Sequence, residues 1–236
     1  GTVNKVFNEL EKITGKEAST TSEVKDKSSK HMNPFQKFVK MLSDIFVPII
    51  PAIVAGGLLM GLNNIFTAKD LFYDGKSIID VHSQFSGLAD MINIFANAPF
   101  TLLPILIGFS AAKRFGGNPY LGAALGMILV HPGLMSAYDF PKALEAGKVI
   151  PHWDVFGLHI NEVGYQGQVL PMLVATYILA TIEKWLRKVI PTVLDNLLTP
   201  LLSIFITAFI TFLFVGPVTR QLGYWLSDGL TWLYEF

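Results

Sequence analysis

The sequence predicts an all-α integral membrane protein: a polytopic helical bundle of five transmembrane helices and an incomplete sixth, with interfacial amphipathic helices. The first observation is composition, because 51% of the residues are hydrophobic and only 15% are charged. The second is that five windows of 20 to 24 residues contain no Asp, Glu, Lys or Arg: 45–68, 91–112, 115–138, 163–182 and 196–219. Each window is long enough to cross a hydrocarbon core about 30 Å thick. A soluble helix of similar hydrophobicity normally carries a charged stripe, and these windows have none.

Three segments precede the first predicted span. Residues 1–14 are predicted to be the last helix of a soluble domain, because their apolar residues share one helical face: Val3, Val6, Phe7, Leu10 and Ile13. Residues 15–33 are rich in Ser, Thr and Lys without apolar periodicity, which predicts a flexible linker. Residues 34–44 are amphipathic, which fits either an interfacial helix on the cytoplasmic leaflet or a helical extension of the first span.

The spans contain many residues that weaken helices. In lipid, a freed backbone group is costly unless a neighbour satisfies it, so proline and glycine here indicate bends and close helix contacts. Gly57-x-x-x-Gly61 and Gly122-x-x-x-Gly126 predict surfaces that another helix approaches closely. Prolines recur in most spans: Pro48, Pro51, Pro104, Pro132, Pro171, Pro200 and Pro217. This pattern favours a transporter or channel with moving parts, and a membrane-bound enzyme or an assembly scaffold is the alternative.

The basic residues predict the orientation. With a cytoplasmic N-terminus, 13 of the 18 Lys and Arg residues fall on the inner side. The short loops carry most weight under the positive-inside rule, and both "AAKRF" and "EKWLRK" then point inwards.

Several stretches together carry a family resemblance: "LSDIFVPIIPAIVAGGLLMGLNN", "KRFGGNPYLGA", "HWDVFGL", "VGYQGQVLP" and "IEKWLRKVIP". From about residue 33 to 236, the chain resembles the membrane component (IIC) of the bacterial phosphotransferase system (PTS), glucose superfamily, sucrose and trehalose branch. Of these stretches, "KRFGGNPYLGA", "HWDVFGL" and "IEKWLRKVIP" are more similar to sucrose permeases, with trehalose permeases next. The segment 34–236 then corresponds to the N-terminal, scaffold part of IIC, and 1–14 resembles the last helix of the preceding IIB domain.

The resemblance implies sugar uptake by group translocation across the bacterial plasma membrane. Such a permease is a homodimer that binds a disaccharide, and the phosphocysteine of IIB, charged by IIA and the general PTS proteins, phosphorylates the sugar. The family's sugar-contacting His and "GITEP"-type glutamate have no counterpart before Phe236, and the chain contains no cysteine. The resemblance therefore implies no catalytic residue in this part of the protein, which by itself should be inactive as a phosphotransferase.

Two sets of residues remain as candidates for binding. Lys113 and Arg114 lie on the predicted cytoplasmic side, where they either attract phosphorylated IIB or simply fix the orientation. The second set suits a sugar, because hydroxyls need donors and acceptors and sugar rings stack on aromatic side chains. It comprises Glu162, Tyr165, Gln166 and Gln168, which form either a sugar contact or an ordered loop that caps the next helix.

His131 joins the second set as an ionisable residue in an otherwise apolar window. The alternative is a neutral histidine bonded to a backbone carbonyl near the outer end of that span.

Composition and motifs limit the other functions. A net charge of zero gives no reason to expect a nucleic-acid partner. The absence of cysteine excludes a thiolate site, and no cluster of His with carboxylates is visible, so neither a metal nor a cofactor is predicted. An ion-coupled sugar symporter would need acidic residues inside spans, and the five windows lack them. A non-catalytic membrane scaffold stays open as the other alternative.

Overall fold

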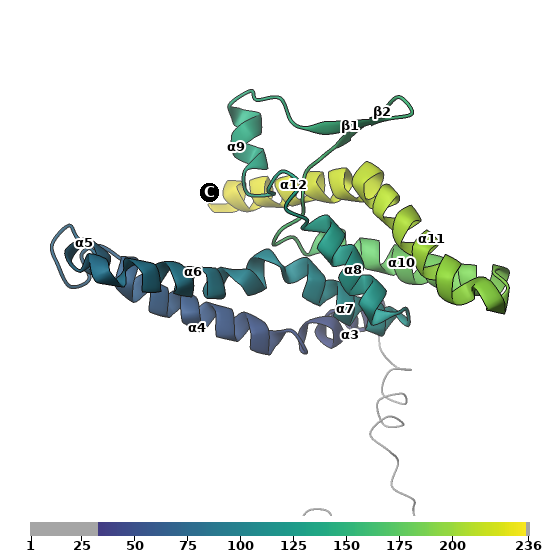
Figure 1. Cartoon of the computed structure of the whole chain (residues 1–236), viewed down its shortest axis with the longest axis horizontal. Coiled ribbons are helices and arrows are strands. Elements are labelled where there is room, and N and C mark those ends of the chain that lie inside the picture. Colours follow the sequence, from purple (N-terminus) through teal and green to yellow (C-terminus); the bar gives the residue numbers. More distant parts are fainter. Residues whose placement is uncertain (1–32, 235–236) are drawn as a thin grey trace, which may run out of the picture. The chain divides into compact units, whose positions relative to one another are not determined.

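The structure, a computed structural model, describes residues 33–234 and is mostly helical (Figure 1). It divides into two compact units, residues 1–43 and 44–236, and each is described by itself. The helix predicted for residues 1–14 and nearly all of the linker predicted for 15–33 lie outside the described residues. The mostly helical character confirms the predicted class, with one departure, a two-stranded hairpin.

The first two described helices are α3 (Pro34–Phe46) and α4 (Ile50–Thr67). A turn at residues 47–49 separates them, so the segment 34–44 is helical without being a continuous extension of the first span. The position of that segment at the membrane surface stays a prediction.

Helix α4 packs along α6 (Ser86–Thr101), as Figure 1 shows. The contact is closest at Gly56, where an added Cβ would lie 2.9 Å from the carbonyl oxygen of Ala96. Among the described residues nothing lies within 4 Å of a Cβ added at Gly57 or Gly61. The glycine that admits a neighbouring helix is therefore Gly56, one residue before the predicted pair.

A tight turn joins α7 (Leu103–Phe115) to α8 (Pro119–Leu129). Gly116 ends α7 in the left-handed region, with φ of 73°, which a residue with a side chain rarely adopts. Asn118 caps the start of α8, because its side-chain oxygen accepts a hydrogen bond of 2.9 Å from the backbone N–H of Tyr120.

Helices α7 and α8 pack backbone to backbone through glycines. A Cβ on Gly122 would overlap the carbonyl group of Gly108, and a Cβ on Gly108 would overlap that of Gly122. One turn further on, a Cβ on Gly126 would lie 2.6 Å from the carbonyl oxygen of Pro104. The close helix contact predicted at Gly122-x-x-x-Gly126 is confirmed.

Short elements occupy the connections. They are α5 (Ile78–Val81), η1 (Ser83–Phe85), α9 (Phe140–Glu145), β1 (His152–Val155) and β2 (Leu158–Asn161). Strands β1 and β2 pair antiparallel in one hairpin.

The last part of the chain contains α10 (Leu170–Val189), α11 (Thr192–Ile210), the π-helical segment η2 (Thr211–Val215) and α12 (Gly216–Tyr234). Helix α10 packs against both α7 and α11. It carries the most buried residues of any described helix and forms the centre of the core: Met172, Ala175, Thr176, Leu179, Ala180 and Leu186.

Three helical stretches in the described chain are long and apolar enough to cross a membrane: 50–67, 83–115 and 192–223. Helix α8 has only 11 residues and extends roughly 16 Å, so the window 115–138 is not one spanning helix. Helix α10 has 20 residues but carries four charged residues in its last two turns. A membrane bundle is thus supported, while the count of five spans stays a prediction.

The prolines fall into two groups. Pro51, Pro119 and Pro171 stand in the first turn of a helix, where the missing N–H has no intrahelical partner to lose. The others interrupt long helical stretches: Pro104 follows the break at residue 102, Pro99 and Pro200 lie inside helices, and Pro217 follows the π-helical segment. The prolines of the described residues therefore mark helix starts as well as interruptions of long helices.

Candidate functional site

A long loop, residues 130–169, contains all five residues predicted to contact sugar. Backbone hydrogen bonds tie its two ends together, since Met135 N–H donates to Glu162 at 2.8 Å and Gly164 N–H donates back to Met135 at 2.8 Å. Tyr165 N–H then donates to the carbonyl of Leu129, the last residue of α8, at 2.8 Å. The loop is consequently an ordered structure fastened to the end of α8.

His131 and Glu162 line one cavity of about 380 Å³, together with Trp153 and Phe212. An imidazole, a carboxylate and an aromatic ring in one cavity match what sugar hydroxyls and sugar ring faces need. Trp153 packs edge-on against Phe212, with ring centroids 5.5 Å apart and planes at 88°. The sequence offers no signal that Trp153, nine residues earlier in the loop, lines the same cavity as Glu162.

The structure places His131 differently from the prediction. It lies beyond the end of α8 in an exposed turn, rather than within an apolar span. Its Nδ1 accepts a hydrogen bond of 3.0 Å from the backbone N–H of Gly133, rather than donating to a carbonyl. The ring proton of the neutral form is therefore on Nε2.

Tyr165 is 2% exposed and packs against the π-helical segment and α12. Its ring lies 5.8 Å from that of Phe212, and its hydroxyl occupies the space that a Cβ on Gly216 would need. The guanidinium of Arg220 lies 5.1 Å from the Tyr165 ring and 4.5 Å from the Phe140 ring. This environment makes Tyr165 a packing residue between the long loop and α12.

The two glutamines have different surroundings. Gln166 is buried, and its side-chain oxygen accepts a hydrogen bond of 2.9 Å from the backbone N–H of Ala137, so it braces the loop. Gln168 instead lines a second cavity of about 340 Å³ with Thr219 and Arg220. Within the described chain, Nη2 of Arg220 is buried without a hydrogen-bond partner. The sequence prediction did not include Arg220.

The five predicted sugar-contact residues are therefore not brought together in one place. His131 and Glu162 share one cavity, Gln168 lines another, and Tyr165 and Gln166 support the loop. A further cavity of about 490 Å³ lies between the hairpin and α11, and its lining is aliphatic and aromatic, so it offers a sugar few hydrogen-bond partners.

The other set of candidates lies at the turn between α7 and α8. Arg114 Nε is 2.9 Å from a carboxylate oxygen of Asp44, and both side chains are partly exposed. Lys113 is exposed and borders a cavity of about 250 Å³ that also includes Pro48 and Ser110. Of the two predicted docking residues, Lys113 has its charge available and Arg114 already has an acidic partner.

Glu183 has a role that the sequence did not reveal. It lies near the charged end of α10, yet it is 3% exposed. Its carboxylate accepts a hydrogen bond of 2.8 Å from the backbone N–H of Asn118 and one of 2.9 Å from Arg187, which also contacts Asp195 at 2.8 Å. Lys184 donates to the carbonyl of Phe115. These bonds fasten the end of α10 to the turn after α7.

The basic residues Lys113, Arg114, Lys184, Arg187 and Lys188 consequently gather at one end of the bundle, here called the basic end. The two short loops that the positive-inside rule assigns to one side are therefore neighbours in space.

The apolar helices and the ordered long loop define an α-helical integral membrane domain. Residues 43–236 match the family described as phosphotransferase system, EIIC, and the chain belongs to that family. It is 84% identical over 236 residues to the PTS system sucrose-specific EIIBC component of Staphylococcus xylosus, covering 100% of this chain and 49% of that protein. No solved structure matches the chain significantly.

Two further relatives differ in the sugar that their names state. The sucrose-specific EIIBC component of Vibrio alginolyticus is 58% identical over 235 residues, covering 100% of this chain and 49% of its own length. The trehalose-specific EIIBC component of Bacillus subtilis is 52% identical over 230 residues, covering 98% of this chain and 49% of its own length. The chain spans about half the length of the curated relatives it matches.

Proposed function

We propose that the whole protein is a PTS permease that takes up a disaccharide by group translocation, with sucrose preferred and trehalose next. The sugar would cross the bacterial plasma membrane and receive a phosphoryl group from the phosphocysteine of a IIB domain, itself supplied by IIA and the general PTS proteins. The observation that carries the proposal is the 84% identity to a sucrose-specific EIIBC component along the entire chain. The 52% identity to a trehalose-specific relative supports trehalose as the second candidate.

The proposed topology has five spans and an incomplete sixth, with the N-terminus and the basic end in the cytoplasm. The clustering of Lys113, Arg114 and Lys188 at one end supports it, because these cations would then share the cytoplasmic side. These 236 residues contain no cysteine, so single-cysteine labelling in whole cells requires only that cysteines elsewhere in the whole protein, including that of IIB, are replaced. K76C should label from outside and K113C only after permeabilisation, and the reverse pattern would overturn the orientation.

Binding roles follow from the geometry. Glu162, His131 and Trp153 are the proposed sugar-contacting residues of this part of the protein, because they share one cavity. Lys113 is the proposed contact for phosphorylated IIB, since its charge is exposed. A homodimer is part of the same proposal, and the unoccupied surface at Gly57 suits a helix from a second copy.

The test uses the whole protein in right-side-out membrane vesicles loaded with the general PTS proteins and phosphoenolpyruvate, with labelled sucrose or trehalose added outside. Phosphorylated sucrose, formed at a higher kcat/KM than phosphorylated trehalose, is the expected result. Labelled sugar that accumulates without phosphate would indicate an ion-coupled symporter. If neither sugar is bound, transported nor phosphorylated, the scaffold alternative gains and the uptake proposal fails.

A further inference from the structure

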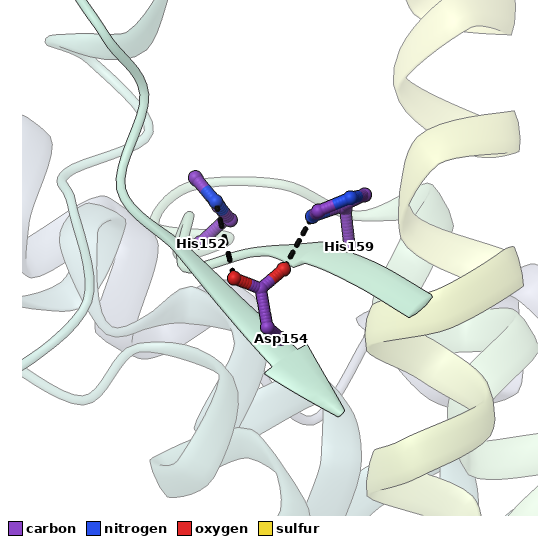
Figure 2. Close-up of side chains that lie close together, drawn as sticks. All are labelled: His152, Asp154 and His159. Atoms are coloured by element: carbon purple, nitrogen blue, oxygen red, sulfur yellow. Dashed lines mark ion pairs between the residues drawn. The ribbon is translucent and has the colours of Figure 1, made fainter. Parts of the chain in front are cut away.

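The hairpin in the long loop has two chemically different faces. Residues two apart on a strand share a face, as do directly paired residues on neighbouring strands. Trp153 pairs with Ile160 on the apolar face, which packs toward Phe212. Asp154 pairs with His159 on the opposite face, and His152 lies two residues before Asp154. Two imidazoles and one carboxylate are therefore displayed together, as Figure 2 shows.

The turn of the hairpin fixes this arrangement. Strands β1 and β2 are joined by Phe156 and Gly157, both with positive φ, 52° and 82°. Two consecutive positive φ values are typical of the type I′ turn, which sets the register of the flanking strands. A slip of one residue would move the side chains of one strand to the other face, so the turn keeps Asp154 opposite His159.

The donor atoms already converge. His152 Nε2 lies 3.8 Å from Oδ2 of Asp154, and His159 Nδ1 contacts Oδ1 of the same carboxylate. One ligand atom from each residue can be chosen so that all three lie within 4.8 Å of one another. Around a single Zn²⁺ with bonds of about 2.0–2.2 Å, such atoms would be roughly 3.3 Å apart. Small side-chain rotations are enough to close that difference.

A second contact fixes the tautomer of His152 that can bind a metal. Its Nδ1 lies 3.2 Å from the carbonyl oxygen of Ile150. A carbonyl only accepts hydrogen bonds, so Nδ1 carries the proton and Nε2 keeps its lone pair on the side of Asp154. Histidines that bind metals are commonly held in this way, with the second ring nitrogen bonded to a carbonyl or a carboxylate.

We propose that the hairpin binds one divalent transition-metal ion, with Zn²⁺ the best fit, through His152, Asp154 and His159. Two imidazole nitrogens favour Zn²⁺, Cu²⁺ or Ni²⁺ over Ca²⁺ and Mg²⁺, which prefer oxygen ligands. Water completes the coordination, because the three side chains are partly or largely exposed. The exposure and the count of three protein ligands predict weaker binding than in a closed four-ligand structural zinc site. The site is separate from the sugar proposal, because it lies on the face of the hairpin opposite Trp153.

The proposal is tested by titrating Zn²⁺ into the purified whole protein, carrying no histidine tag, against a chromophoric chelator. Wild type should bind Zn²⁺, and H152Q and H159Q should each weaken that binding at least tenfold. The matched control is H82Q, since His82 is also exposed but lies outside the hairpin, and it should bind as wild type does. Zn²⁺ should also raise the thermal midpoint of wild type and leave that of the H152Q/H159Q double variant unchanged.

Copper supplies an independent readout that does not depend on stability. The electron paramagnetic resonance spectrum of bound Cu²⁺ should show coupling to two nitrogens in wild type and to one in H159Q. The proposal is overturned if the double variant binds Zn²⁺ as tightly as wild type, or if H82Q alone removes the binding. Thermal unfolding without metal identifies any variant that fails to fold. If H152Q or H159Q fails, the Zn²⁺ affinity of the other single variant tests the proposal.

Discussion

The packing of α7 against α8 gives a sharp test at Gly126. In G126A the new Cβ would lie 2.7 Å from the Cα of Ile105, whereas carbon atoms in contact are about 3.5 Å apart. The helices would have to separate locally by about 0.8 Å. A gap of 0.5–1 Å forfeits about a quarter to a half of each contact's attraction. We expect a loss of about 1–3 kcal/mol in the free energy of unfolding, as for other overpacked sites.

The assay is reversible unfolding of the purified protein from mild detergent into SDS, followed by tryptophan fluorescence. The matched control is G87A, because Gly87 is also helical but has nothing within 4 Å of an added Cβ. That control should be neutral or up to about 1 kcal/mol more stable, since alanine favours a helix over glycine. Equal stability of G126A and G87A would refute the inferred backbone contact.

Three further predictions address other parts of the molecule. E162Q should raise KM for sucrose phosphorylation several-fold, because it removes a charged acceptor from the cavity. K148Q, an exposed change in the same loop, should leave KM unaltered, and an equal KM for both variants would exclude Glu162 from the sugar site. E183Q should cost about 1–3 kcal/mol in SDS unfolding, because a buried carboxylate loses a charged hydrogen bond, and an unchanged unfolding curve would contradict that role. The pKa of Asp80 is lowered, first by the hydrogen bond from the backbone N–H of Ser77 and then by that from its hydroxyl. The ionised carboxylate therefore stabilises the fold fully above about pH 4, the ordinary pKa of an aspartate, and this stabilisation is lost as the pH falls through the lower pKa of the folded protein. Protection of the Ser77 amide from hydrogen exchange should fall across that range in wild type and be low at every pH in D80N, and a pH-independent wild type would disprove the assignment.

The sequence predicted the structure best where a residue pattern has one physical explanation. Charge-free windows identified the apolar stretches, and Gly122-x-x-x-Gly126 identified a true backbone contact. The same rule failed at Gly57, because spacing alone does not show which face of α4 meets α6, and the contact is made by Gly56. A pattern of small residues reveals a possible contact, while its partner depends on the long-range arrangement.

The candidate sites were predictable only in part. Loop composition singled out Glu162 and His131, but their meeting with Trp153 depends on hydrogen bonds between the two ends of the long loop. No cluster of His with carboxylates is visible along the sequence, yet Asp154 and His159 face each other across the hairpin. Their separation along the chain matches no familiar ligand motif, because it is set by a turn and a strand register. The burial of Glu183 depends likewise on a long-range contact, because its carboxylate accepts a hydrogen bond from the backbone N–H of Asn118.

The π-helical segment Thr211–Val215 determines which side of α12 faces the long loop. One extra residue in a helical turn rotates everything that follows by about 100° about the axis. That rotation brings Gly216 beneath the Tyr165 hydroxyl and Arg220 beside the Tyr165 ring. Deleting a single residue from this segment would leave two apolar helices of nearly unchanged length and composition, but would turn both residues away from the loop. The rotational orientation of α12 about its own axis is thus set by one irregular turn before it.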